Sequence, residues 1–222
     1  MGGNLPIYDT FRKIWLKYLT RNRLFKVFFL RYRNNYINNV EMDDEHSCLY
    51  INGVEPNDRT AHSLLINKTI SALKYVNNNF NYKYIIRTSI GTFWNLFKLQ
   101  PYLKNMNSNI KVIGQTHDNG VISGTCMIFT HEVATKIVLN QNCIKQNIYE
   151  DLAFGYAFKS LGYNIFNLNR RFDFIHNTIN DVLKQISISD QKDMFLFRVN
   201  NQKDRDTIDS YIFEQLYIYF YG

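Results

Sequence analysis

The sequence is poor in cysteine, and its cysteines follow no metal-binding or disulfide spacing. Cys48, Cys126 and Cys143 are far apart and odd in number, so they indicate neither a disulfide framework nor a zinc site. We interpret them as reduced thiols of a cytosol-like compartment, buried as small hydrophobic side chains. A secreted protein stabilised by disulfides is therefore not expected.

Long hydrophobic segments are also missing. A transmembrane helix needs about 20 consecutive apolar residues, and no run of that length occurs. The apolar segment FKVFFL at 25–30 is much shorter and has charged residues on both sides. The N-terminus is not expected to be a signal peptide, because Arg12, Lys13 and Lys17 interrupt its apolar positions. We therefore expect no transmembrane segment.

Three short motifs that each indicate a particular chemistry are absent. The sequence has no G-x-x-x-x-G-K-[ST], no G-x-G-x-x-G and no H-E-x-x-H. Phosphate loops, dinucleotide-binding fingerprints and zincin metal sites therefore have no support. There is also no internal repeat, low-complexity tract or linker, so we predict a single domain over residues 1–222.

The chain is rich in apolar residues and in positive charge. Hydrophobic residues make up 45% and aromatic residues 16% of the 222 residues, which is ample for the core of one domain. The formal net charge is +7, which suits an anionic partner such as nucleic acid, a phosphorylated small molecule or an acidic surface. A solvated basic surface without such a partner explains the same charge.

The apolar periodicity predicts helices that alternate with short buried strands. A basic amphipathic helix is expected near the N-terminus, whose apolar face is formed by Ile7, Phe11, Ile14, Trp15 and Tyr18. We expect the polar segment 34–46 to be a surface connection. We expect Pro101 to end the helix that runs up to Leu99. Strands are predicted at 26–32, 47–53, 82–87, 110–115, 120–130 and 163–168. Further helices are predicted at 60–78, in a segment that ends at Leu99, at 131–140, at 150–160 and around 208–219.

This alternation predicts an α/β domain with a mixed, largely parallel central sheet flanked by helices. Ligands of such sheets bind beyond the carboxyl ends of the strands. Arg87 ends an otherwise apolar strand, where a guanidinium can clamp a phosphate through two parallel hydrogen bonds. An ordinary surface arginine is the alternative. Lys68 lies among the apolar positions of the 60–78 helix and either snorkels to solvent or points into a cleft toward phosphate.

Acidic residues and histidines supply the other candidates. Glu150 and Asp151 open the helix at 150–160, where the helix dipole favours negative charge. One of them can also face a cleft as a general base. His176 follows a basic and aromatic segment, and Asp118 stands beside His117. These residues are weak candidates for a metal site, since a lone histidine or two adjacent residues form no ligand set.

The segment LLINKTISALKYVNNNFNYKYIIRTSIGTFWNLFKL at 64–99 resembles the family 31 glycosyltransferases. These enzymes include β-1,3-galactosyltransferases, N-acetylglucosaminyltransferases and fringe-like enzymes. In that family, a helix with a Lys-Thr pair precedes a hydrophobic strand, which runs into a basic residue, a threonine and an Asp cluster. The matching residues here are Lys68-Thr69, Arg87-Thr88, Thr92-Phe93 and Asn95-Leu96.

Two later segments continue the resemblance in the same order. VISGTCMIFTHEVATKIV at 121–138 is similar to the acceptor-side strand and helix of the family. YEDLAFGYAFKSLGY at 149–163 is similar to its Glu-Asp-x-x-x-Gly helix. The resemblance covers roughly residues 47–176. It implies a single GT-A, Rossmann-like domain that transfers a sugar, with inversion, from a nucleotide-sugar donor to a hydroxyl of a glycan or protein acceptor.

The resemblance also implies roles for individual residues. Asp151 matches the catalytic aspartate that removes the proton from the acceptor hydroxyl, and Glu150 would orient or cap. Ser123 and Gly124 would line the acceptor side. The family's Asp cluster binds a divalent metal at the donor diphosphate, but this sequence has Ser89-Ile90-Gly91 there. Mg²⁺ and Mn²⁺ prefer carboxylate oxygens, so we predict that no metal is required.

Fixed cations could then stabilise the leaving diphosphate in place of the metal. Donor-binding candidates are Arg87, Lys68, Thr88, Ser89 and Arg31, with Arg170 or Arg171 as further cations. A divalent metal held by His176 and Asp118 is one alternative. Another is a catalytically silent domain that keeps only a glycan- or nucleotide-binding pocket.

The abundance of Asn, Ile, Lys and Tyr and the compact length also resemble glycosyltransferases encoded by large DNA viruses, which would place the protein in the host cytoplasm. A nucleic-acid-binding protein is a third hypothesis, motivated by the net charge and the aromatic residues. The sequence has no basic stripe with interleaved aromatics and no known binding module. Nucleic acid is therefore not expected as a partner.

Overall fold

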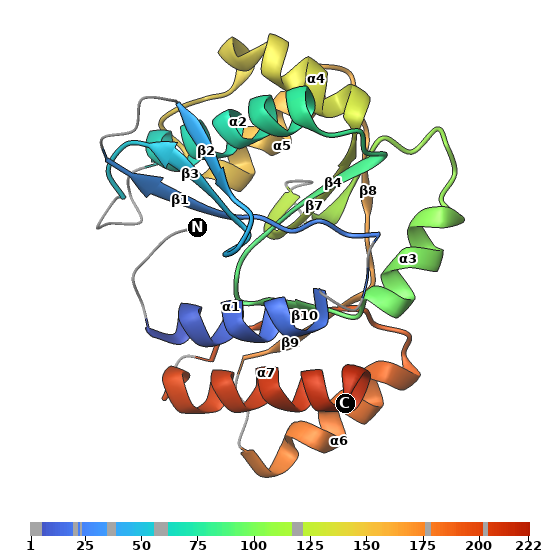
Figure 1. Ribbon diagram of the computed structural model, residues 1–222. Helices are drawn as coiled ribbons and strands as arrows, with labels where there is room; N and C mark the ends of the chain where they lie inside the picture. Colours follow the sequence, from blue (N-terminus) through green and yellow to red (C-terminus); the bar gives the residue numbers. More distant parts are fainter. Residues whose placement is uncertain are drawn as a thin grey trace. The chain divides into compact units, whose positions relative to one another are not determined.

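The chain is represented by a computed structural model (Figure 1), in which α-helices and β-strands alternate. Its contacts divide the chain into two compact units. Unit 1 contains Val27–Thr88 and Ser108–Leu168, and unit 2 contains Asn4–Lys26, Ser89–Asn107 and Asn169–Gly222. The structure describes residues 6–19, 22, 24–34, 39–55, 62–116, 122–175, 179–201 and 204–222.

Unit 1 is built on a four-stranded mixed sheet. Its strands are β4 (Tyr84–Thr88), β6 (Val112–Thr116), β7 (Ile122–Thr130) and β8 (Ile165–Asn167), in the order β4-β7-β6-β8. β7 pairs antiparallel with both β4 and β6, whereas β6 and β8 are parallel. The long central strand β7 therefore has a partner on each side along most of its length.

Three helices pack against this sheet to form the main core of unit 1. They are α2 (His62–Asn79), α4 (His131–Leu139) and α5 (Glu150–Ser160), and they lie close together in Figure 1. Met127 and Phe129 of β7 belong to this core, because alternate residues of a strand face the same side of the sheet. The helices contribute Ile66, Ile70, Leu73, Val133, Ala134, Ile137, Ala153, Phe154, Ala157 and Phe158.

A second, three-stranded sheet in unit 1 has the order β1-β3-β2. It contains β1 (Phe29–Arg33), β2 (Val40–Asp43) and β3 (Cys48–Asn52). The prediction that residues 34–46 form a surface connection is wrong for β2. Val40 and Met42 of that strand pack against a small core, but two apolar residues among polar neighbours are too short a pattern to indicate a strand.

Unit 2 contains the sheet β5-β10-β9, none of whose strands was predicted. Its strands are β5 (Thr92–Trp94), β9 (Arg171–Phe174) and β10 (Leu196–Val199). β10 is parallel to β9 and antiparallel to β5. Each strand has only three or four residues, and a run that short gives no usable periodicity.

The helices of unit 2 are α1 (Pro6–Leu19), α3 (Leu96–Lys104), α6 (Val182–Gln191) and α7 (Arg205–Tyr221). The predicted apolar face of α1 is confirmed: all five of its residues are buried. α1 and α7 are joined by aromatic pairs, including Phe11 and Phe213, whose ring centroids are 4.1 Å apart. α6 was not predicted.

Pro101 lies inside α3 and does not end it, which contradicts the prediction. The helix begins after Asn95, whose side chain accepts a hydrogen bond from the Lys98 amide at 3.3 Å. Proline removes one backbone hydrogen bond from a helix interior. The helix continues because Leu99 and Leu103 on either side of the proline are buried, and tertiary packing supplies most of the stability of a protein helix.

The predicted α/β class with a mixed central sheet is confirmed, but the expectation that this sheet is largely parallel is wrong, because two of the three pairings in β4-β7-β6-β8 are antiparallel. β7 follows β6 after only five residues, too few for the crossover that a parallel pair needs. Parallel pairing joins β1 to β3, β6 to β8 and β9 to β10, and the four other pairings among the described strands are antiparallel. The remaining predicted helices and strands coincide with observed ones apart from small shifts at their ends. Cys48 and Cys126 are buried free thiols, as expected, and Cys143 is half-buried. No helix among the described residues combines the length and apolar character that a membrane crossing requires.

Candidate functional site

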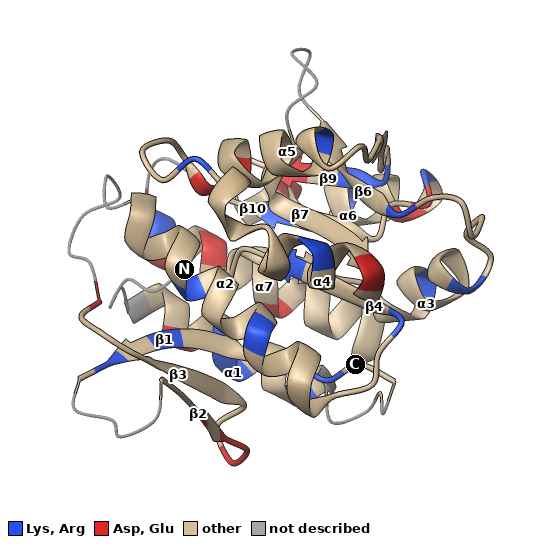
Figure 2. Ribbon diagram, turned by 90° about the horizontal axis from the view of Figure 1, so that it is seen from above, with Lys and Arg blue, Asp and Glu red and all other residues tan. Residues whose placement is uncertain are grey.

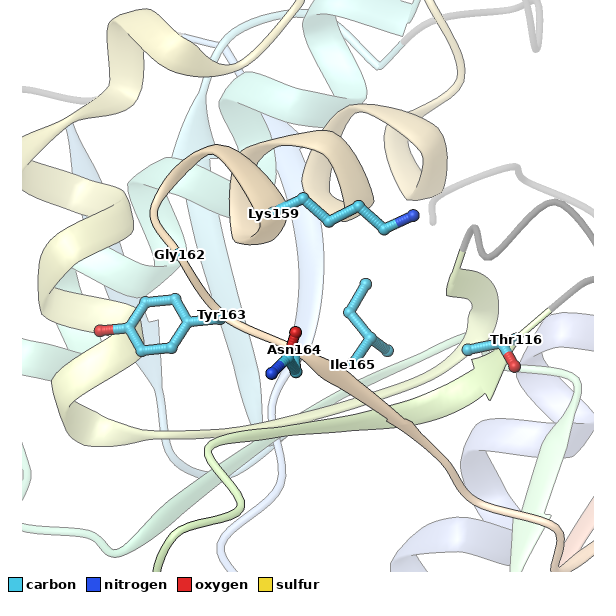
Figure 3. A pocket seen from close by; sticks show the side chains of 6 residues that line it. All are labelled: Thr116, Lys159, Gly162, Tyr163, Asn164 and Ile165. Atoms are coloured by element: carbon cyan, nitrogen blue, oxygen red, sulfur yellow. The ribbon is translucent and has the colours of Figure 1, made fainter.

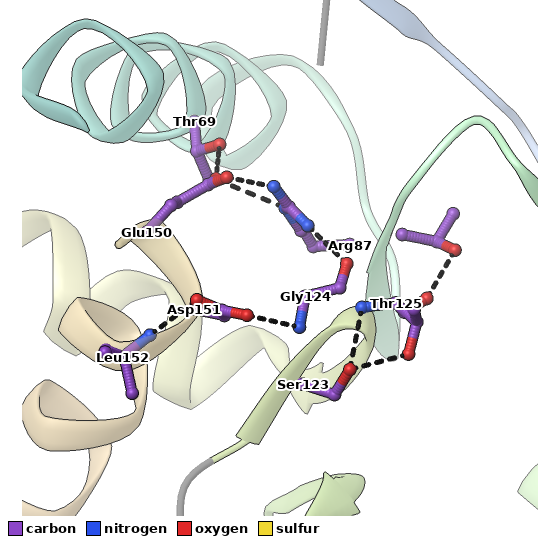
Figure 4. A network of polar contacts seen from close by, with 9 residues as sticks. Thr69, Arg87, Ser123, Gly124, Thr125, Glu150, Asp151 and Leu152 are labelled. Carbon is purple, nitrogen blue, oxygen red and sulfur yellow. Dashed lines mark hydrogen bonds and ion pairs between the residues drawn. The ribbon is translucent and has the colours of Figure 1, made fainter. Parts of the chain in front are cut away.

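Glu150, the first residue of α5, is the centre of a buried polar network in unit 1 (Figure 4). Arg87 of β4 donates to both of its carboxylate oxygens, from Nε to Oε1 at 3.2 Å and from Nη2 to Oε2. The Thr69 hydroxyl of α2 donates to Oε1 as well. The Arg87 and Glu150 side chains are only 10% and 6% exposed. This is therefore a buried ion pair rather than a surface one, and its strength depends on having these additional hydrogen bonds.

The same arginine also connects this network to β7. Nη1 of Arg87 donates to the carbonyl oxygen of Gly124 at 2.5 Å. The guanidinium of Arg87 therefore links the end of β4, the beginning of β7 and the first residue of α5. Because the five donors of a guanidinium have a fixed planar geometry, this arrangement fixes the position at which α5 begins.

Asp151 is held by backbone amides rather than by a cation. The amide of Gly124 donates to Oδ2 at 3.0 Å, and the amide of Leu152 donates to Oδ1 at 3.0 Å. The side chain is half-buried. A carboxylate can accept about four hydrogen bonds, so each oxygen of Asp151 keeps capacity for a further donor. This is what a proton acceptor for an incoming hydroxyl needs.

Gly124 allows this close approach of β7 to α5. A Cβ atom at Gly124 would lie 3.2 Å from Oδ2 of Asp151 and 3.4 Å from Nη1 of Arg87. These separations are shorter than comfortable contacts between a methyl group and polar atoms. Gly124 is therefore a positioning residue for Asp151, consistent with the importance of glycine where backbone and functional group meet closely.

The hydroxyl groups beside Gly124 form a second set of bonds. The Ser123 and Thr125 hydroxyl oxygens are 2.9 Å apart, and the Thr88 hydroxyl donates to the Thr125 carbonyl at 2.7 Å. Ser123 and Thr125 are buried. The Thr88 hydroxyl thus joins the end of β4 to the beginning of β7, whereas the Ser123 hydroxyl contacts Thr125 within β7 (Figure 4). Their predicted roles toward donor and acceptor stay predictions.

Lys68 lies in a second buried ion pair of unit 1. Its Nζ donates to Oε1 of Glu55 at 2.5 Å and lies 4.6 Å from the centroid of the Tyr32 ring. The Lys68 side chain is 2% exposed, so it does not snorkel to solvent. Burial lowers the pKa of Lys68, and the hydrogen bond and charge of Glu55 oppose this effect.

The two ion pairs act on each other electrostatically. Glu150 raises and Arg31 lowers the pKa of Lys68, after the larger effects of burial and of Glu55. Burial and the charge of Glu55 raise the pKa of Tyr32 to about 12, and Glu150 adds to this. The structure thus gathers Arg31, Lys68 and Arg87, three of the predicted donor-binding cations, in one region of unit 1. It also supplies Glu55, which sequence reasoning missed because no motif surrounds it.

Ser89 belongs to unit 2 and has different partners there. Its hydroxyl oxygen lies 2.9 Å from that of Thr92 and accepts a hydrogen bond from Nη1 of Arg198 at 2.7 Å. Arg198 was not predicted as a site residue, since the strand that carries it was not recognised. The weak metal candidates His176 and Asp118 lie outside the described residues. Within the described ranges, no three His, Cys, Asp or Glu side chains are grouped as a metal site would require.

A pocket of about 460 Å³ lies elsewhere in unit 1 (Figure 3). Neither Arg87, Lys68 nor Asp151 lines it. None of the described residues that line it carries a carboxylate or an imidazole that could act as an acid or a base. The residues that line it are Thr116, Lys159, Gly162, Tyr163, Asn164 and Ile165.

The distribution of charge gives no sign of a nucleic-acid groove. Figure 2 shows Lys and Arg spread over many helices and strands, with Asp and Glu among them. A nucleic-acid-binding surface normally gathers its basic residues on one face or along one helix. That nucleic acid is not a partner nevertheless stays a prediction.

The fold is similar to that of a protein of known structure. No family model matches the chain, and no curated protein matches it. Among solved structures, the chain is similar to a glycosyltransferase involved in the glycosylation of the major capsid of PBCV-1. The TM-score is 0.53 at 11% sequence identity, and the match covers 97% of this chain and 95% of that one. The likeness concerns the fold and extends over both chains, whereas membership of family 31 stays a prediction.

Proposed function

We propose that the protein is a glycosyltransferase that moves a sugar from a nucleotide-diphosphate donor to a hydroxyl of a glycan or protein acceptor. The observation that carries the proposal is the carboxylate of Asp151, held by the Gly124 amide at 3.0 Å with capacity for another donor. The full-length similarity to a glycosyltransferase supports the same reaction class.

Asp151 acts as the general base in this proposal. As the acceptor oxygen bonds to the anomeric carbon, its proton passes to the carboxylate of Asp151. The bond from the anomeric carbon to the phosphate oxygen breaks, and the nucleoside diphosphate leaves with that electron pair. Attack opposite the leaving group inverts the anomeric centre. Glu150 is less suited to this role, because a proton on its carboxylate would remove the charge that pairs with Arg87, and in this proposal it orients the start of α5.

The leaving diphosphate carries negative charge that must be stabilised. Arg87, Lys68, Arg31 and Thr88 remain our candidates in unit 1. Arg87 and Lys68 already have Glu150 and Glu55 as partners, so a diphosphate would compete with these carboxylates. In this proposal, the two cations and their carboxylate partners act on the diphosphate through their combined electrostatic field. They do not act as two unpaired cations.

The test begins with a thermal-shift screen of UDP-glucose, UDP-galactose, UDP-N-acetylglucosamine and GDP-mannose, with and without Mn²⁺, since a ligand of the native state raises the melting temperature. Release of nucleoside diphosphate from the selected donor is then measured. Asp151→Asn is expected to lower turnover by about 100-fold or more, the usual contribution of a general base, with donor affinity unchanged.

Asp206→Asn is the matched control. Asp206 is the second residue of α7, as Asp151 is of α5, and it is exposed. The control therefore removes an equivalent charge from a helix start and is expected to leave turnover unchanged. An Asp151→Asn enzyme with most of its turnover would show that the base is another group.

A catalytically silent sugar-nucleotide- or glycan-binding domain is the second candidate. Two observations favour it: Arg87 and Lys68 are neutralised by carboxylates, and Ser89-Ile90-Gly91 has no carboxylate. A donor that raises the melting temperature but is never hydrolysed or transferred, with Mn²⁺ or with chelator, would support this candidate. Turnover that survives the chelator would instead support a metal-free transferase.

A further inference from the structure

Two arginines of unit 2, Arg198 and Arg205, lie beside the segment Ser89–Gly91. Arg198 of β10 donates from Nη1 to the Ser89 hydroxyl at 2.7 Å. A Cβ atom at Gly91 would lie 2.8 Å from the same Nη1 and 3.7 Å from Nη2 of Arg205. The absence of a side chain at Gly91 therefore leaves room for the guanidinium of Arg198, with that of Arg205 close to it. We add Arg171 to this arginine cluster because its charge lowers the pKa of Arg198.

The members of the arginine cluster differ in how their charge is balanced. Nε of Arg205 donates to Oδ2 of Asp209 at 2.8 Å, and Nε of Arg171 donates to Oδ1 of Asp173 at 2.6 Å. For Arg198, no carboxylate of the described residues lies within ion-pair distance, and its hydrogen bond goes to a neutral hydroxyl. Arg198 is therefore a cation without a direct ion pair among the described residues, although Asp173, its register partner on β9, acts on it weakly.

Keeping a charged group in this position is unfavourable for the folded protein. Burial and the positive charges of Arg205 and Arg171 lower the pKa of Arg198 to about 10, while Tyr8 and Asp173 oppose this weakly. The guanidinium is still charged at neutral pH. Charged groups maintained against burial and like-charge repulsion are typical of functional sites.

The same segment does not fit a divalent metal. By the resemblance, residues 89–91 stand where family 31 enzymes have metal-binding aspartates. The oxygen atoms available here are hydroxyls of Ser89 and Thr92, whereas Mg²⁺ and Mn²⁺ are held by carboxylates. A metal ion would also lie against the cationic Arg198. The residues are suited to an anion rather than to a metal.

We propose that Arg198, with Arg205 and Arg171, forms an anion site in unit 2 that binds the diphosphate group of a nucleoside diphosphate. A guanidinium offers two parallel N–H groups that match phosphate oxygens. Arg205 and Arg171 are each paired with a carboxylate, so the net positive charge of the site comes from Arg198. The proposal concerns unit 2 by itself, and the choice of a nucleoside diphosphate as the ligand rests on the proposed glycosyltransferase function.

The site is tested by calorimetric titration of inorganic pyrophosphate and of UDP into the full chain, with EDTA present. Both ligands are expected to bind the wild type without metal. Arg198→Met should weaken both by at least about tenfold, since hydrogen bonds to charged groups contribute at least that much. Arg198→Lys keeps the charge but loses the planar pair of donors, so its affinities should fall between those of Arg198→Met and the wild type.

Stability separates a binding role from a structural one. Arg198→Met removes a half-buried charge that the neighbouring arginines repel, so its melting temperature should equal or exceed that of the wild type. Lys184→Gln is the charge-matched control, because Lys184 is exposed on α6 of the same unit. It should leave both affinities unchanged.

Several results would overturn the anion site. They are a wild type that needs Mn²⁺ to bind pyrophosphate, an Arg198→Met protein that binds as tightly as the wild type, and equal weakening by Lys184→Gln. Failure of the proposed function looks different: pyrophosphate and UDP would bind through Arg198, but no donor would be turned over. Conversely, sugar transfer with unchanged kcat and KM in Arg198→Met would keep the function and refute the site.

Discussion

Replacing Glu150 with glutamine removes one negative charge from the buried network of unit 1 with almost no change in volume. The Arg87 guanidinium would then be left without its carboxylate, although it would keep the Gly124 carbonyl at 2.5 Å. With side chains only 10% and 6% exposed, the remaining charge is poorly solvated. Breaking a buried pair by removing one partner costs about 3–5 kcal/mol, and we expect Glu150→Gln to lower the free energy of unfolding by that amount.

Removing both charges should cost less than the sum of the single changes. In the double variant Arg87→Met with Glu150→Gln, no uncompensated charge stays buried, and the amide oxygen of the new glutamine can still accept the Thr69 hydroxyl. Methionine fills much of the volume of the arginine side chain. The two single variants and the double variant form a double-mutant cycle that isolates the coupling between the two residues.

The assay is urea-induced unfolding followed by far-UV circular dichroism at pH 7, for the wild type and the three variants. A loss below about 1 kcal/mol for Glu150→Gln would place the pair among exposed salt bridges and refute the reasoning. Strict additivity of the two single changes would refute it as well, since the coupling would then be zero.

Two further predictions concern packing and alkaline stability. Gly114→Ala in β6 should lower the free energy of unfolding by about 1–3 kcal/mol, the usual cost of overpacking, because its Cβ would lie 2.7 Å from the Cys126 carbonyl and against Ile122; an unchanged urea midpoint would contradict this. Burial raises the pKa of both Tyr32 and Tyr82 from 10.0 to about 12. Between these values the unfolded chain binds fewer protons than the folded one, so stability should fall as the pH rises from 10 to 12. Comparison of urea midpoints at pH 9 and pH 11 tests this, and Tyr82→Phe should show a smaller fall than the wild type.

The sequence predicted those helices and strands whose apolar pattern extends over several turns or residues. α1 is an example, since Ile7, Phe11 and Tyr18 recur at helical spacing and are all buried. β7 is another, as a long run of apolar residues with partners on both sides. The strands of unit 2 were missed for the opposite reason. β9 reads RFDF, with charges at two of four positions, and its pairing with β10 depends on residues more than twenty positions away.

Some candidate site residues were named from the sequence, but none of their pairings was. Arg87 and Asp151 were identified from their places at a strand end and a helix start. That Arg87 pairs with Glu150, 63 residues later, is a result of tertiary packing that no local pattern contains. Glu55 pairs with Lys68 for the same reason. The sequence could name the cations, but only the structure shows which of them are already balanced by carboxylates.

Arg87 and Arg198 differ in whether a carboxylate pairs with their charge, and this difference predicts opposite effects of their replacement. Arg87 has a carboxylate partner within its own unit, so much of its charge is used to stabilise the fold. Arg198 has no such partner among the described residues, and its burial beside other arginines opposes folding. Arg87→Met should therefore change the free energy of unfolding more than it changes the free energy of pyrophosphate binding. Arg198→Met should lower pyrophosphate affinity and leave the free energy of unfolding unchanged or higher. Urea unfolding and calorimetry on the same two variants measure both quantities. If both arginines lowered stability and affinity in equal proportion, the balance of charge would not distinguish a structural cation from a ligand-binding one in this protein.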